Sequence, residues 1–273
     1  MYSERAIVQP QVSLTSFVCD VLADQVRIWS FPRLLLQGKH WRPTLLFLAV
    51  TGLLFLVDPF DPNYFRHATE FHAFNLIVSG HNATVAMWTI MIVSLVAGLL
   101  RSDRYLTGTF VYAFEAVLNC EILTQVLKGI DRRVRPQDIH TYRHFFDSWF
   151  ADPGHWYAGP GSFPSGHMIA AMSIATVFAV RYRRQRWAPW VAYGLAATIG
   201  FSRITLLSHF PSDVFAATVL GYIIARYVVL RAPEAPAWQE SSVPSGAEVA
   251  GVRAMHQPQG LRALPYREAE PSE

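Results

Sequence analysis

The chain has 273 residues, of which 52% are hydrophobic and only 16% are charged. An ordinary soluble domain has about 25% charged residues, so this composition favours a membrane protein over a soluble one. The formal net charge of +3 is small, and it gives no reason to expect a nucleic-acid partner.

Residues 1–42 form a segment of their own before the first long apolar run. The stretch VSLTSFVCDVLADQVRIWSF places apolar residues at helical intervals between Leu14 and Val26, which predicts an amphipathic helix. Two placements stay open for this helix: flat on the membrane surface, or packed against the rest of the protein. Cys19 and Cys120 are the only cysteines, and we expect both to be inert buried thiols rather than a disulfide.

Six apolar segments follow, and they predict six membrane spans. Several are shorter than the ~20 residues that a bilayer requires, but flanking Trp, Tyr, Arg and Lys side chains extend them. We therefore expect an all-α, polytopic membrane protein: a six-helix transmembrane bundle within residues 43–231, preceded by the N-terminal amphipathic helix. The tail, 232–273, is rich in Pro, Glu, Ser, Gly and Gln and is predicted to be disordered. The expected spans are 43–57, 83–100, 105–127, 165–180, 187–201 and 214–230.

Ionisable residues gather in three short stretches at the ends of these spans. LKGIDRRVRP closes the third span, FPSGHM opens the fourth, and SRITLLSHFPSD joins the fifth to the sixth. If the spans alternate in direction, all three stretches lie on one face of the membrane. Ionisable groups are costly at membrane depth, so their convergence predicts a functional site.

The first two stretches have the features of an anion-binding site. Lys128 and Arg135 are seven residues apart, about two helical turns, and share a face if the helix continues that far. Ser165 is a suitable N-cap, and the amides of Gly166 and His167 would point outward from a helix N-terminus. Together these groups predict a cradle for a phosphate.

The third stretch has the features of an activated nucleophile. Pro211 suits the first turn of a helix, which places His209 just before that helix and Asp213 inside it. Asp213 could then accept a hydrogen bond from one ring nitrogen of His209 and leave the other nitrogen free to attack. His167 is a second histidine that is able to donate a proton.

The same residues resemble a known signature. K-x6-RP (Lys128 to Pro136), PSGH (Pro164 to His167) and SR-x5-H-x3-D (Ser202 to Asp213) are similar to the three motifs of the phosphatidic acid phosphatase type 2 superfamily, in its membrane lipid phosphatase branch. The resemblance covers roughly residues 43–230. It implies hydrolysis of a phosphate ester or diphosphate through a phosphohistidine, without a metal or other cofactor. By this resemblance His209 is the nucleophile, Asp213 orients it, His167 protonates the leaving oxygen, and the phosphoryl oxygens are held by Lys128, Arg135, Ser165, Gly166 and Arg203.

The loop between the third and fourth spans permits two further interpretations. Its histidines and aspartates invite a metal site, but no helix start accompanies them, and we expect no metal there. Its many aromatic residues between Gln137 and Phe163 suggest either a lip at bilayer level that holds lipid chains or a cap that packs over the helix ends. The ionisable residues concerned are His140, His144, Asp147, Asp152 and His155.

The expected substrate is a membrane lipid phosphate, and its identity stays open. Phosphatidic acid, phosphatidylglycerophosphate, a polyprenyl diphosphate and a lipid A type glycolipid all present similar charge. Three other functions are alternatives: a phosphotransferase that uses the same phosphohistidine, an enzyme like the vanadate-dependent haloperoxidases, and a non-catalytic anion-binding or transport protein. The last needs no pair of histidines, and six spans argue against the haloperoxidase.

The distribution of basic residues predicts the orientation. Sixteen of the 23 Lys and Arg residues fall on the side opposite the three motifs, and seven fall on the motif side. Because cytoplasmic loops carry the excess of Lys and Arg, both termini are expected in the cytoplasm and the active site on the extracytoplasmic face. The expected location is a cell membrane, namely a bacterial inner membrane.

Overall fold

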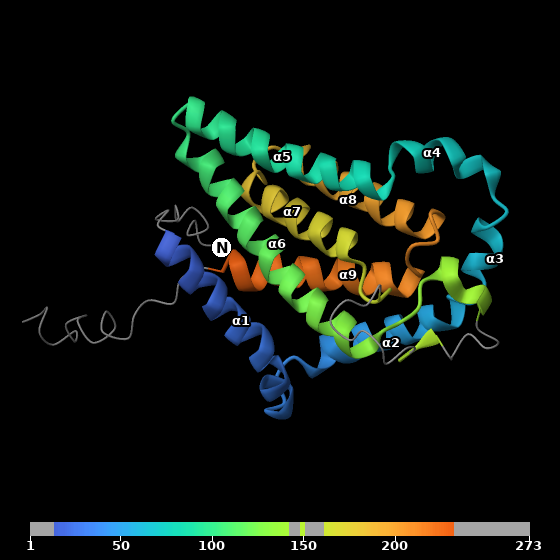
Figure 1. Ribbon diagram of the computed structural model, residues 1–273. Helices are drawn as coiled ribbons and strands as arrows, with labels where there is room; N and C mark the ends of the chain where they lie inside the picture. Colours follow the sequence, from blue (N-terminus) through green and yellow to red (C-terminus); the bar gives the residue numbers. More distant parts are fainter. Residues whose placement is uncertain (1–13, 142–147, 151–160, 232–273) are drawn as a thin grey trace, which may run out of the picture. The chain divides into compact units, whose positions relative to one another are not determined.

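The computed structural model describes residues 14–141, 148–150 and 161–231, and every regular element within those ranges is a helix (Figure 1). The predicted disorder of the tail concerns residues outside these ranges. The main helices are α1 (Leu14–Leu36), α2 (Trp41–Val57), α3 (Asp61–Phe65), α4 (His72–Ile77), α5 (Gly80–Leu100), α6 (Arg104–Asp131), α7 (Gly166–Arg181), α8 (Ala188–Thr205) and α9 (Pro211–Ile223), which continues as a π-helical segment over Ile224–Val229.

Each of the six expected spans coincides with one of these helices, namely α2 and α5 to α9. Three helical stretches in the described part of the chain are long and apolar enough to cross a membrane: Thr69–Leu100, Arg104–Ile139 and Pro211–Val229. The pair α1 and α2, bent by 101° at its break, makes a fourth if it is counted as one span. The protein is therefore a multi-pass membrane protein, and the count of six spans stays a prediction.

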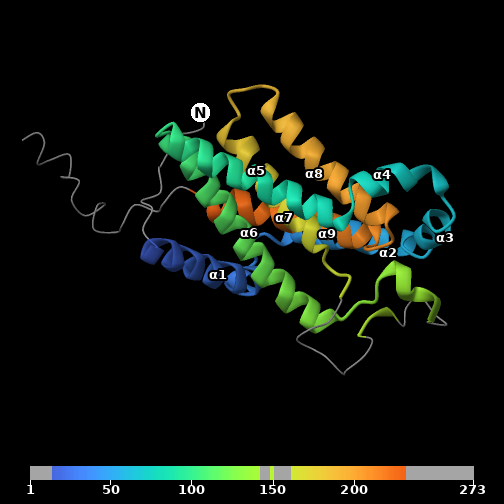
Figure 2. The same ribbon diagram turned by 45° about the horizontal axis from the view of Figure 1, so that its top comes forward.

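Helix α7 lies at the centre and packs against α6, α8 and α9 (Figures 1 and 2). Its buried positions are rich in small residues such as Ala171, Ser173 and Ala175. Small residues allow the backbones of neighbouring membrane helices to approach closely. The closest approach involves Gly221 of α9, where an added methyl group would lie 2.6 Å from the carbonyl oxygen of Ile169. Close packing thus fixes α7, which carries one predicted motif, against α9, which carries another.

The N-terminal helix α1 packs against α6 through polar side chains. The Asn119 amide of α6 donates to Asp24 at 3.2 Å, and the Gln25 amide donates to Asn119 at 2.7 Å. The ring of Phe17 stacks on Phe114 at a centroid distance of 5.6 Å. The opposite side of α1 exposes apolar residues, among them Leu14, Val18, Leu22 and Val26. These contacts favour packing against the bundle, while a position on the membrane surface stays a prediction.

The two cysteines differ in their surroundings. Cys120 is fully buried within α6, as expected, and both thiols are free. Cys19 is exposed on α1, so the expectation that it is buried was wrong. The reason is that α1 contacts its neighbours through one side only, and Cys19 lies on the other.

Candidate active site

The three predicted motifs meet at one end of the bundle. Lys128 lies in the last turn of α6, and an added methyl group on Gly166, the first residue of α7, would lie 3.7 Å from its Nζ. A methyl group on Gly80, the first residue of α5, would lie 3.1 Å from Nη1 of Arg203 and 3.8 Å from Nε2 of His167. The ends of α5, α6, α7 and α8 therefore bring their predicted side chains together.

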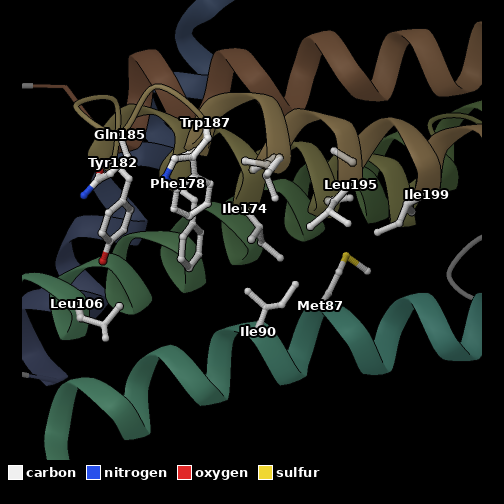
Figure 3. A pocket seen from close by; sticks show the side chains of 16 residues that line it. Met87, Ile90, Leu106, Ile174, Phe178, Tyr182, Gln185, Trp187, Leu195 and Ile199 are labelled. Atoms are coloured by element: carbon white, nitrogen blue, oxygen red, sulfur yellow. The ribbon is translucent and has the colours of Figure 1, made fainter. Parts of the chain in front are cut away.

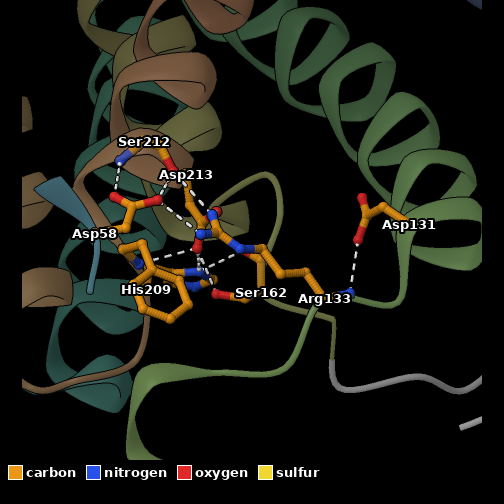
Figure 4. A network of polar contacts seen from close by, with 8 residues as sticks. Asp58, Asp131, Arg133, Ser162, His209, Ser212 and Asp213 are labelled. Atoms are coloured by element: carbon orange, nitrogen blue, oxygen red, sulfur yellow. Dashed lines mark hydrogen bonds and ion pairs between the residues drawn. The ribbon is translucent and has the colours of Figure 1, made fainter. Parts of the chain in front are cut away.

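His209 lies in the loop between α8 and α9 and is only 3% exposed. Its Nδ1 is 2.6 Å from the carbonyl oxygen of Ser162, so Nδ1 carries the hydrogen and the lone pair is on Nε2. The expected direct hydrogen bond to Asp213 is not formed, because Nδ1 lies 3.8 Å from Oδ2 of that carboxylate (Figure 4). The oxygens of Asp213 are occupied instead by the Ser162 hydroxyl, the Phe210 amide at 2.9 Å, and Arg133.

Burial is the main influence on the pKa of His209, and it lowers that pKa below the ordinary value. Asp213 opposes the shift, whereas the positive charges of Lys128 and Arg135 add to it. His209 is therefore a neutral imidazole near pH 7, in the state that a nucleophile requires. The same influences show that Lys128 and Arg135 lie within electrostatic range of His209.

His167 faces the first turn of α5. Its Nε2 lies 3.1 Å from the Thr84 hydroxyl and 3.2 Å from the carbonyl oxygen of Gly80. Arg203 donates to the carbonyl oxygen of Val78, two residues before α5, at 2.7 Å. The beginning of α5 therefore forms one wall of the site and fixes the positions of both side chains.

Two buried hydroxyl groups at the site have no hydrogen-bond partner among the described residues. Ser165 occupies the predicted N-cap position of α7, but its side chain does not bond to the helix. The hydroxyl of Thr124, one turn before Lys128 on α6, is likewise unpaired. Because an unpaired buried hydroxyl is costly, both groups are suited to contact a bound anion.

This arrangement suits the binding and cleavage of a tetrahedral anion. Lys128, Arg135 and Arg203 each lie within electrostatic range of one or both histidines, at the N-terminus of α7. Within the described part of the chain, Nε2 of His209 has no hydrogen-bond partner. Among the described residues, no cluster of three or more His, Cys, Asp or Glu side chains is placed to hold a metal ion. The loop residues His144, Asp147, Asp152 and His155, whose side chains are of the types that bind metals, lie outside the described residues.

Comparison with known proteins gives the same family as the motifs. Residues 109–236 match the family model of the PAP2 superfamily. This part of the chain therefore resembles the PAP2 superfamily. All eight predicted site residues lie within the matched region.

Several relatives carry names that describe lipid phosphatases. The lipid A 1-phosphatase of Rhizobium etli is 33% identical over 118 residues, which are 43% of this chain and 47% of that protein. The undecaprenyl-diphosphatase BcrC of Bacillus subtilis is 40% identical over 68 residues, which are 25% of this chain and 34% of that protein. The aligned region thus spans about half, or less, of these relatives' length. A crystal structure of a PAP2 type phosphatidylglycerolphosphate phosphatase from Bacillus subtilis matches with 19% identity and a TM-score of 0.40, covering 78% of this chain and 92% of that one.

The PAP2 motifs do not account for every residue at the site. Gly80 and Thr84 of α5 and Asp58, which directly follows α2, lie before the matched region. Inside the matched region, Arg133 occupies a variable position of the first motif, and Ser162 lies between the first and second motifs. Asp58 is recognisable in the sequence as a candidate functional residue, because it is ionisable and directly follows an apolar run. For Gly80, Thr84 and Ser162 the sequence carries no comparable signal.

An apolar groove runs between α5, α7 and α8 (Figure 3). Its volume is about 550 Å³, and it is lined along α7 by Ala171, Ile174, Phe178 and Tyr182. Ala171 lies one turn after His167 on the same side of α7, so the Ala171 end of the groove is the end nearer to that histidine. From there to Tyr182 it follows α7 for roughly 16 Å.

The structure describes only part of the loop from Gln137 to Phe163, which is rich in aromatic residues. Trp149 packs against the rings of Phe55 and Phe163 and over the guanidinium group of Arg133. It therefore acts as part of a cap over the helix ends, which is one of the two expected roles. Phe150 is 70% exposed and remains suited to contact lipid. The other predicted lip residues, including Phe146, lie outside the described residues.

Proposed function

We propose that the protein hydrolyses a phosphate monoester or diphosphate of a membrane lipid through a phosphohistidine on His209. The observation that carries this proposal is the hydrogen bond from Nδ1 of His209 to the carbonyl oxygen of Ser162, which leaves Nε2 free inside a ring of cationic groups. A protein that only binds an anion does not need a nucleophile oriented in this way. The names of the PAP2 relatives support a lipid phosphatase.

The proposed reaction has two steps. Nε2 of His209 attacks phosphorus and forms a P–N bond, while the bond between phosphorus and the lipid oxygen breaks and His167 protonates that oxygen. A water molecule then attacks the phosphohistidine, His167 accepts its proton, and the P–N bond breaks to release inorganic phosphate. Lys128, Arg135 and Arg203, with the amides at the start of α7, stabilise the charge that develops on the phosphoryl oxygens.

We propose that these groups supply the charge stabilisation that a metal ion provides in other phosphatases. Three cations and one helix N-terminus converge on the space where the phosphoryl group would lie. On this basis activity should not depend on added divalent cations, and vanadate should inhibit by imitating five-coordinate phosphorus.

The groove supports a lipid rather than a soluble substrate. In the proposed binding mode the hydrocarbon chain follows the groove from His167 towards Tyr182, and the lipid oxygen leaves beside the first turn of α5. Both lipid A and undecaprenyl diphosphate, the substrates named for the relatives, are lipids of this kind. We further propose that the protein has six spans, with both termini in the cytoplasm and the site on the extracytoplasmic face.

The test is phosphate release by the purified full-length protein in detergent. We expect release from at least one long-chain substrate in a panel of lipid A, undecaprenyl diphosphate, phosphatidylglycerophosphate and phosphatidic acid, with little release from a water-soluble phosphate ester. Activity should persist in EDTA, and His209→Ala should abolish it. His72→Ala, which changes an exposed histidine on α4, serves as the matched control.

Three results would contradict parts of this proposal. Full activity in His209→Ala would exclude His209 as the nucleophile. Loss of activity in EDTA that is restored by a divalent cation would exclude the metal-independent reaction. Transfer of phosphate to an added alcohol or lipid acceptor, at the expense of release to water, would identify a phosphotransferase instead.

A further inference from the structure

Arg133 lies between the motif residues Lys128 and Arg135, yet it is almost completely buried, with 1% of its surface exposed. Its guanidinium group contacts the carboxylate of Asp213 and donates to the Ser212 hydroxyl at 2.8 Å. It also forms an ion pair with Asp58 at 2.7 Å (Figure 4). One guanidinium group therefore joins two buried carboxylates.

Aromatic rings enclose this guanidinium group. The centroids of Phe55, Trp149 and Phe210 lie 5.2, 4.6 and 4.1 Å from its central carbon. Rings at these distances attract a cation and exclude water. Charges interact more strongly where water is excluded, so the charge of Arg133 acts strongly on both carboxylates.

Asp58 connects this network to the N-terminal half of the chain. It follows α2, and its carboxylate accepts hydrogen bonds from the backbone amide of Ser212 at 3.1 Å and from the Ser212 hydroxyl at 2.5 Å. Asp58 therefore anchors the first turn of α9, which also carries Asp213. Burial raises the pKa of the Asp58 carboxyl, and the charge of Arg133 opposes that rise.

The charges of the network have a consequence for His209. With both carboxylates ionised, Asp58, Arg133 and Asp213 carry a net charge of minus one. The Oδ2 atom of Asp213 lies 3.8 Å from Nδ1 of His209. When Nε2 of His209 forms a bond to phosphorus, the ring gains a positive charge because Nδ1 keeps its hydrogen. A net negative charge nearby stabilises the positively charged ring. An ion pair of Arg133 and Asp213 alone would have no net charge and would not give this stabilisation.

We propose that Asp58 and Arg133 are positioning residues that set the orientation and the effective charge of Asp213, and through it the reactivity of His209. This inference rests on the proposed phosphohistidine reaction and extends its site into the chain before the PAP2 match. Arg133 holds the carboxylate of Asp213 in place and ionised. Asp58 compensates part of the positive charge of Arg133, so the negative charge of Asp213 is not fully cancelled and still acts on His209.

The inference predicts opposite effects for two substitutions that remove one charge each. In Arg133→Gln, the buried carboxylates of Asp58 and Asp213 lose their shared cation, and the pair takes up a proton near neutral pH. Asp213 is then protonated as the pH falls, so the acid limb of the kcat profile should move to higher pH by about one unit or more. In Asp58→Asn, Asp213 is the only carboxylate left beside Arg133, and the charge of Arg133 cancels that of Asp213. The pKa of His209 then falls, so the acid limb should move to lower pH.

The substitutions leave the other charged groups that face Asp213 in place. These are His209 itself and, on α6, Lys128 and Asp131. Arg135, which acts on His209, is also unchanged. Both variants should also lower kcat, by up to about 100-fold, while KM changes little, because neither residue is placed to contact the substrate. Arg133→Lys keeps the charge and should keep the position of the acid limb.

The experiment measures kcat and KM between pH 4.5 and 9 for the wild type and these three variants, with Arg132→Gln as the matched control. Arg132 is the neighbouring residue, and its side chain donates to the carbonyl oxygen of Gly129 at 3.3 Å. Opposite shifts of the acid limb in Arg133→Gln and Asp58→Asn, with no shift in Arg132→Gln, would support the inference.

Other outcomes separate failure of the inference from failure of the proposed function. An active wild type whose acid limb shifts in neither variant, or in the same direction in both, would reduce the network to a structural role. A wild type that releases no phosphate from any lipid would overturn the proposed function itself. If Arg133→Gln does not fold, Asp58→Asn and Arg133→Lys still decide the question.

Discussion

At the residue scale, the burial of His209 determines how activity should depend on pH. As the proposed nucleophile, His209 must be neutral, and burial lowers its pKa from the ordinary value of 6.5, so the neutral form persists to lower pH than in an exposed histidine. The acid limb of kcat/KM should therefore lie below pH 6.5. Lys128→Gln removes one of the charges that lower this pKa and should move the limb to higher pH while raising KM.

A control is needed for this profile because the second pKa of a phosphate monoester lies near 6. That ionisation belongs to the substrate, so it contributes equally to the pH profile of every variant. The difference in acid-limb position between the wild type and Lys128→Gln therefore reports on the protein. A wild-type limb at or above the value of an exposed histidine, with no shift in Lys128→Gln, would contradict the assignment of His209.

At the scale of the elements, the contact of α7 with α9 should be sensitive to a single methyl group. Gly221→Ala places a carbon 2.6 Å from the backbone oxygen of Ile169, and backbone cannot move aside as a side-chain tip can. We expect a loss of about 1–3 kcal/mol in the free energy of unfolding and a parallel loss of activity. Gly194→Ala on α8 is the control, because a methyl group there meets no atom within 4 Å. Equal thermal stability of the two variants in detergent would show that this contact does not hold α7 in place.

At the scale of the whole molecule, the distribution of Lys and Arg predicts which face carries the site. Cys19 is exposed and must first be replaced by Ser, whereas the buried Cys120 can remain. In that background, Phe150→Cys should react with a membrane-impermeant maleimide on intact cells, and Arg184→Cys only after permeabilisation. The reverse pattern would place the site in the cytoplasm and the termini outside.

The sequence alone was enough to locate the helices and the candidate residues. Runs of apolar residues predicted the six segments that became α2 and α5 to α9, since a membrane helix must be apolar along its length. The spacing of the motifs predicted that Lys128, Gly166, His167, Arg203 and His209 would meet, because alternating helices bring their ends to one face. These are properties of local sequence and chain direction, and they do not depend on the details of packing.

Only the tertiary structure decided which groups contact one another within the site. His209 bonds to Ser162, 47 residues away, rather than to Asp213, and Ser212 bonds to Asp58 across 154 residues. Such pairs depend on the angles at which α2, α6, α7 and α9 pack, and a single sequence carries no pattern for them. Whether a buried charge such as Arg133 lies at the site or elsewhere is likewise determined by where its partners lie, because a buried ion is stable only beside a counter-charge.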